Sequence, residues 1–213
     1  MLLQILTYTH HLTTMLFGIF LSAFFLGVKQ NKKNVCILLG GGAVSGLFFL
    51  ICNTVFGSLF TEAVYPIFVH LPLFLLLVFY YRFRWLPSII SIMTAYLCCQ
   101  FSNWAGIFAL SLSGLDWVYY LVRIIVTVAV FAFLSRYLCQ TTALLFAKSD
   151  RELYILGAMP FVYYVFDYST TKFSMLLYSG NKVVVEFLAF AMCISYVIFL
   201  FVYFQEYELK NPR

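Results

Sequence analysis

A histidine flanked by prolines is the first group in this sequence whose position calls for a chemical explanation. His70 lies in Pro66-Ile-Phe-Val-His70-Leu-Pro72, within an otherwise apolar stretch. Proline lacks a backbone N–H and crowds the carbonyl four residues earlier, so a helix bends or breaks near Pro66 and Pro72 and needs polar partners there. His70 can donate to a freed carbonyl, which is a structural role, and it can also contact a ligand or sense pH. We expect no metal site, because no second ligand stands at helical spacing.

Two further ionisable residues lie inside apolar stretches. A charge is energetically costly there, so each of these residues is a candidate functional residue. Arg123 lies six residues into its stretch, roughly 9 Å deep at the helical rise of about 1.5 Å per residue. Asp167 lies near the outer end of another stretch. At a shared depth, these two side chains can form an ion pair that locks two helices together. Ligand binding is the alternative for both, and Arg123 can instead extend its guanidinium to the membrane surface.

Amides and aromatic rings add to these groups. Gln100 and Asn103 interrupt the fourth apolar stretch, Glu186 lies in the seventh, and Pro160 predicts a kink in the sixth. The sixth stretch also carries an aromatic run, consisting of Phe161, Tyr163, Tyr164, Phe166 and Tyr168. Because these groups map to the centre or outer half of the predicted helices, they favour a pocket that opens outward. Ordinary anchoring at the membrane interface is the alternative.

The composition indicates that a membrane must position these residues. The chain has 213 residues, of which 64% are hydrophobic and 10% are charged, whereas soluble domains contain about 45–50% and about 25%. Too few polar residues remain to cover a soluble globule of this size. Because the apolar excess runs along the whole chain, we expect an all-α, polytopic membrane protein that forms one domain over residues 1–213.

Charges and turn residues divide the chain into seven apolar segments, each near the length of about 20 residues that crosses the hydrocarbon core. They cover residues 5–28, 35–56, 63–81, 86–110, 117–138, 153–170 and 183–204. The fourth is the least regular, since its amides can end it early and leave 104–112 as a re-entrant or interfacial piece. In the second, Gly42 and Gly46 form the small-xxx-small pattern, which indicates packing within the chain more often than dimerisation.

The basic residues predict the orientation. Ten of the thirteen fall on one side of the segments, namely Lys29, Lys32, Lys33, Arg82, Arg84, Arg136, Lys148, Arg151, Lys210 and Arg213. Lys172 and Lys182 fall on the other side, and Arg123 lies within a segment. The positive-inside rule therefore places the N-terminus outside and the C-terminus in the cytoplasm. The net charge of +5 reflects this arrangement, so we do not expect nucleic acid as a partner.

Catalytic motifs are missing from the sequence. It contains no glycine-rich phosphate loop and none of the common hydrolase or intramembrane-protease patterns. The six cysteines show no metal-ligand spacing. We therefore expect a protein that is not an enzyme and holds no cofactor.

Three short runs resemble a known bacterial family. They are Tyr65-Pro-Ile-Phe-Val-His70-Leu-Pro72-Leu-Phe-Leu, Trp85-Leu-Pro87-Ser-Ile-Ile-Ser and Thr94-Ala-Tyr-Leu-Cys-Cys-Gln100. The region 65–104 is similar to the N-terminal membrane sensor region of Firmicutes GHKL-type histidine kinases, whose relatives include receptors for peptide pheromones. The resemblance implies seven spans with the N-terminus outside. The family motif matches this chain at Pro66, His70, Pro72 and Gln100. The resemblance assigns no role to these four residues.

The resemblance also implies what this chain lacks. Family members continue after the last span into a coiled linker, a phosphoacceptor histidine and an ATP-binding domain, whereas this sequence ends at Arg213. We therefore expect a sensor portion without phosphotransfer activity, either truncated or free-standing.

The expected function is that of a receptor in the bacterial plasma membrane. It would detect an extracellular or membrane-embedded ligand, such as a peptide, and signal to a cytoplasmic partner, and we expect a homodimer. The alternatives are a small membrane transporter or substrate-capture subunit, and a scaffold without a ligand. Broken helices in repeated halves would favour the transporter, but the sequence shows no repeat.

Overall fold

The computed structural model describes residues 2–57, 60–61, 64–147, 150–172 and 182–210. Apart from short turns, the residues in these ranges are helical, and none of them forms a strand. The elements in chain order are α1 (Leu2–Phe25), α2 (Lys32–Phe56), α4 (Tyr65–Phe68), α5 (His70–Leu75), the π-helix η1 (Leu76–Tyr80), α6 (Trp85–Cys98), α7 (Gln100–Ser113), α8 (Asp116–Tyr137), α9 (Cys139–Phe146), α10 (Asp150–Lys172) and α12 (Lys182–Lys210). The all-α prediction is confirmed for the described residues.

Three helical stretches are long and apolar enough to cross a membrane. They are Lys32–Phe56, Trp85–Ser113 and Asp116–Tyr137, and two shorter apolar stretches are Tyr65–Tyr80 and Phe190–Leu200. The structure therefore supports a helical membrane protein.

The fourth predicted segment is one long rod. Cys99 joins α6 to α7 with a right-handed helical backbone (φ −64°, ψ −19°), so Gln100 and Asn103 do not end the helix. The piece 104–112, for which a re-entrant or interfacial position was one alternative, instead continues the rod within α7.

The third predicted segment, by contrast, is broken. It divides into α4, α5 and η1, with the first interruption at Val69 (φ −116°, ψ −50°). Pro72 explains this position, because it cannot donate to the carbonyl of Phe68 and its ring crowds that carbonyl. An interruption near the prolines is thus present, one residue before His70, and the bend itself stays a prediction.

The core lies between α1 and α6. The second half of α1 is almost fully buried from Phe17 onward, and α6 buries ten of its fourteen residues. A hydrogen bond of 2.5 Å from the Ser91 hydroxyl to the Ser22 carbonyl joins the two helices inside this core. Around them, α8 packs on α1 and α7, while α10 packs on α6.

The glycine pattern of α2 packs within the chain. A Cβ atom on Gly42 would lie 3.1 Å from Ile19 Cδ1, and one on Gly46 would lie 3.5 Å from Met15 Cε. Both contacts are to α1, so these glycines allow α1 and α2 to approach closely.

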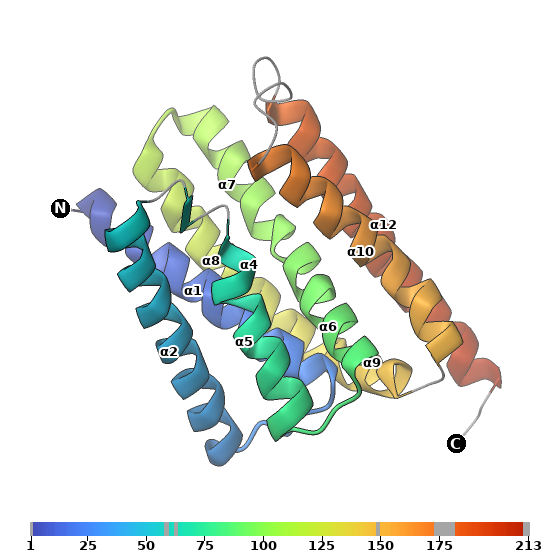
Figure 1. The fold of residues 1–213 in the computed structure, drawn as a ribbon. Coiled ribbons are helices and arrows are strands. Elements are labelled where there is room, and N and C mark those ends of the chain that lie inside the picture. The colour runs from blue at the N-terminus through green and yellow to red at the C-terminus, as the bar shows by residue number, and fades with distance from the viewer. Residues whose placement is uncertain (1, 58–59, 62–63, 148–149, 173–181, 211–213) are drawn as a thin grey trace.

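Three connections that carry or adjoin basic residues gather at one end of the bundle. Figure 1 shows the turn between α1 and α2, the turn between η1 and α6, and helix α9 all at the lower end of the view. Arg84 forms an ion pair of 2.7 Å with Asp150 at the start of α10, which joins two of these connections. The turns that the sequence predicts to lie on the basic side are therefore neighbours in space.

Candidate functional site

The break in the third segment places His70 among aromatic rings from three elements. Tyr65 of α4, Tyr96 of α6 and Tyr164 of α10 have ring centroids 5.4, 5.8 and 5.5 Å from that of His70. The Tyr164 hydroxyl lies 2.8 Å from His70 Nδ1, which is hydrogen-bond distance. His70 of α5 therefore contacts α6 through the ring of Tyr96 and α10 through the hydroxyl and ring of Tyr164.

A second hydrogen bond extends this group to a carboxylate. The Tyr96 hydroxyl donates to Asp167 Oδ2 at 2.5 Å, and Asp167 is buried. The rings of Tyr96 and Tyr164 lie 4.9 Å apart in an edge-on arrangement. We call these five residues, Tyr65, His70, Tyr96, Tyr164 and Asp167, the His70 cluster.

The spacing of residues on α10 explains how one helix supplies so much of the cluster. Pro160, Tyr164 and Asp167 stand at positions i, i+4 and i+7, which share one face of a helix. The assigned α10 helix runs through Pro160 without interruption. Pro160 thus does not break α10, and the kink predicted at this residue stays a prediction.

Tyr196 of α12 supplies the hydrogen-bond donor that α10 lacks at Pro160. Because Pro160 has no N–H, the carbonyl of Leu156 loses its usual helical donor. The buried Tyr196 hydroxyl donates to that carbonyl at 3.0 Å. One turn from the His70 cluster, α10 is therefore hydrogen-bonded to α12.

The structure does not pair Arg123 with Asp167. Arg123 Nη1 donates to the Tyr119 hydroxyl, the guanidinium carbon lies 5.1 Å from the centroid of the Tyr119 ring, and no acidic partner contacts Arg123 among the described residues. The backbone of Gly106 in α7 packs against the Arg123 side chain. In place of the expected ion pair, Arg123 contacts Tyr119 within α8 and packs on Gly106 of α7.

The two predicted amides lie together on α7. Asn103 Nδ2 donates to Gln100 Oε1 at 3.3 Å, and Gln100 is buried. The side chains of Glu186 and Tyr168 lie outside the described residues. Of the predicted site residues, the structure therefore joins His70 and Asp167 through two tyrosines and leaves Arg123, Gln100 and Asn103 in other contacts.

Sequence reasoning missed three tyrosines of this region. Tyr65 and Tyr96 belong to the runs that carry the family resemblance, and Tyr196 lies in the last apolar segment. A tyrosine in such a segment has no spacing signature, because its partner comes from another helix. The available signal was the cost of an unpartnered hydroxyl in an apolar bundle, which makes each buried tyrosine a candidate for a polar contact.

The described pockets lie away from the His70 cluster. One of about 190 Å³ is lined by residues of the basic turns, and one of about 230 Å³ lies between Thr13–Phe20 of α1 and Thr127–Phe131 of α8. Neither contains a predicted site residue. The expected outward pocket over His70 thus stays a prediction.

Chemically, the cluster can exchange hydrogen bonds without large movement. The Tyr164 hydroxyl donates to His70 Nδ1 in one imidazole tautomer and accepts from it in the other. A ligand that bonds to His70 or Asp167 would compete with Tyr164 or Tyr96. Breaking either bond leaves a polar group in an apolar bundle, so such competition favours a different packing of α5, α6 and α10.

Comparison with protein-family models finds no match, and no curated protein or solved structure matches the chain. The resemblance to the membrane region of histidine kinases therefore stays a prediction. What the chain offers is an all-helical fold with membrane-length helices and a buried polar cluster at a helix break.

Proposed function

We propose that this chain is a membrane sensor whose His70 cluster responds to an extracellular or membrane-embedded ligand, such as a peptide. In this proposal, the chain crosses the bacterial plasma membrane seven times, with the N-terminus outside and the C-terminus in the cytoplasm. The charge distribution along the sequence supports that orientation. The sensor acts on a cytoplasmic partner and works as a homodimer.

One observation carries the proposal: the broken third segment is hydrogen-bonded to α10, and α10 is hydrogen-bonded to α12. The first link is His70 with Tyr164, and the second is Tyr196 with Leu156. A sensor needs an element with two packings whose balance a ligand shifts. The Val69 break supplies a place where α5 can move, and α12 runs on to Lys210.

A reporter fusion tests this function without knowledge of the ligand. The catalytic half of a GHKL-type histidine kinase would be joined after Arg213 of the full chain, and its autophosphorylation would be measured in membranes. His70→Ala should change the basal output several-fold, because it removes the bond between α5 and α10. The matched control is Leu71→Ala, whose side chain is exposed on the neighbouring position, and this variant should keep the wild-type output.

The same fusions also define the outcome that would contradict the proposed function. If His70→Ala accumulates to the wild-type level in membranes and its output equals that of Leu71→Ala and of the wild type, the cluster does not control signalling. The proposal would then be rejected.

A further inference from the structure

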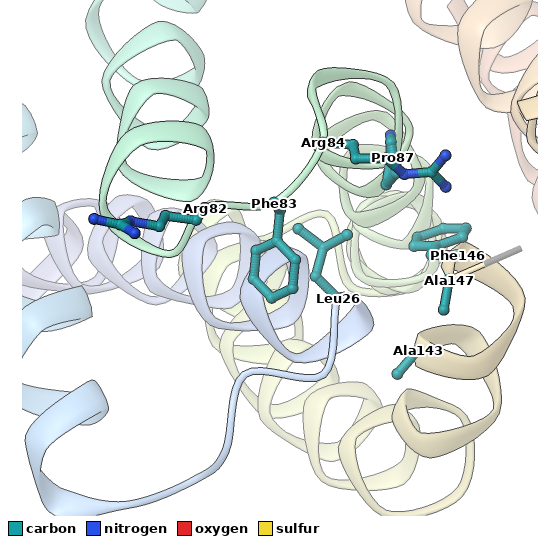
Figure 2. A pocket seen from close by; sticks show the side chains of 8 residues that line it. All are labelled: Leu26, Arg82, Phe83, Arg84, Pro87, Ala143, Phe146 and Ala147. Atoms are coloured by element: carbon teal, nitrogen blue, oxygen red, sulfur yellow. The ribbon is translucent and has the colours of Figure 1, made fainter.

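A pocket at the basic end of the bundle has no role in the proposed sensing. It has a volume of about 190 Å³ and lies between the end of α1, the turn from η1 to α6, and α9. Leu26, Phe83 and Phe146 supply apolar surface, and Arg82 and Arg84 belong to its lining. Figure 2 shows the Leu26 and Phe83 side chains close together, with the two guanidinium groups on opposite sides of them.

The backbone at Arg82 adds an independent observation. Arg82 has φ +57°, and it is the only non-glycine residue with a positive φ among those the structure describes. This conformation is unfavourable for a residue with a Cβ atom, and such residues concentrate at functional positions. The Arg82 side chain is exposed and makes no hydrogen bond or ion pair with another described residue.

Arg84 differs from Arg82 in its partner. It forms the 2.7 Å ion pair with Asp150, and both side chains are about half exposed. This pair holds the start of α10 beside the pocket. The positive charge of Arg82 is thus the one at this site that no described carboxylate offsets.

We propose that this pocket binds the headgroup region of an anionic phospholipid. The pocket lies where α1 ends and α6 begins, which is the level of lipid headgroups for helices that cross a bilayer. One water molecule needs about 10–15 Å³ of such cavity volume, so a pocket of about 190 Å³ has room for a group many times larger, such as glycerophosphate. The Arg82 side chain extends away from Leu26 and Phe83 in Figure 2, but it is exposed and no described residue holds it, so it can turn to a phosphate at the rim of the pocket. The apolar side chains meet the glycerol and the first part of the acyl chains. The inference needs only that the bundle crosses a bilayer, and not that the protein is a sensor.

Native mass spectrometry of the purified full chain tests this proposal. The probe is phosphatidylglycerol, offered in detergent together with an equal amount of phosphatidylcholine, and the readout is the lipid retained by the protein. Arg82→Gln should weaken phosphatidylglycerol retention about fivefold, as expected for one basic residue near an anionic lipid surface. Arg136→Gln removes the same charge from an exposed site at the end of α8 and should leave retention unchanged.

Two more variants separate the effect of the Arg82 charge from backbone strain and from the free volume of the pocket. Arg82→Gly also removes the charge but relaxes the backbone, since glycine adopts this φ without strain, and it should match Arg82→Gln. Ala147→Phe keeps every charge and adds a ring at an exposed lining position, so it should also lower retention. The proposal is overturned if the wild type does not prefer phosphatidylglycerol, or if Arg136→Gln has the same effect as Arg82→Gln.

Soluble glycerol 3-phosphate distinguishes a lipid from a free phosphate. It carries the same anionic group without acyl chains, so it should not displace phosphatidylglycerol from the wild type. Displacement at equal concentration would mean that the pocket recognises a water-soluble anion, and the lipid proposal would fail. Neither result depends on the reporter output, so this test and that of the proposed function are independent.

Discussion

The hydroxyl group of Tyr164 links α10 to the broken third segment through a hydrogen bond with His70. It lies 2.8 Å from His70 Nδ1, in a part of the bundle where Asp167 and Tyr96 form a second hydrogen bond. Tyr164→Phe removes this one group and should lower the free energy of unfolding by about 0.5–1.5 kcal/mol, the usual net contribution of a hydrogen bond. Thermal unfolding in detergent measures the change.

The matched control at the residue scale is Tyr137→Phe. Tyr137 is 59% exposed and donates no hydrogen bond to another described residue. It should unfold within about 0.5 kcal/mol of the wild type. A loss in Tyr137→Phe equal to that in Tyr164→Phe would show that the bond to His70 contributes nothing specific.

At the scale of elements, the bond between α10 and α12 depends on a proline. Tyr196→Phe should destabilise the protein by about 1 kcal/mol, because the Leu156 carbonyl then has neither a helical donor nor the Tyr196 hydroxyl. Pro160→Ala restores an N–H four residues after Leu156, so Tyr196→Phe should cost less in that background. A double-mutant cycle measures the coupling, and additive effects would contradict this account of Pro160.

A second contact between elements relies on the absence of a side chain. A Cβ atom on Gly157 of α10 would lie 2.6 Å from Ile90 Cδ1 and Cγ1 in α6. Gly157→Ala should therefore destabilise by about 1–3 kcal/mol, and the same substitution should cost less when it is made in an Ile90→Ala background. Gly40→Ala is the control, because nothing lies within 4 Å of its Cβ position, and it should be neutral or stabilising. Equal stability of both glycine variants would contradict the close approach of α6 and α10.

At the scale of the whole molecule, the charge distribution predicts which end faces the cytoplasm. Gln30 lies in the turn between α1 and α2, and Leu115 lies between α7 and α8; both are exposed. A membrane-impermeant maleimide should label Leu115→Cys in intact cells and Gln30→Cys only after permeabilisation. The native Cys36 is also exposed, so both variants would be made in a Cys36→Ser background. The reverse labelling pattern would show that the orientation is inverted.

The helical class could be predicted from the sequence because bilayer-crossing helices are constrained in length and polarity, and the structure has three stretches of membrane length where seven were predicted. The helical class followed from composition, and the break near His70 followed from Pro66 and Pro72. The partner of Asp167 could not be predicted in the same way. The sequence allowed Asp167 and Arg123 to share a depth, but pairing depends on which faces of α6, α8 and α10 meet. That is set by packing contacts such as Gly157 with Ile90.

The most direct test of the sensor proposal is the output of the kinase fusion in three variants that each lose one hydroxyl. Tyr164→Phe removes the bond from α10 to His70, Tyr196→Phe removes the bond from α12 to Leu156, and Tyr137→Phe removes neither. If the His70 cluster controls α12, the first two variants should shift basal autophosphorylation several-fold while Tyr137→Phe matches the wild type. Wild-type output from both Tyr164→Phe and Tyr196→Phe, at wild-type protein levels, would contradict the account.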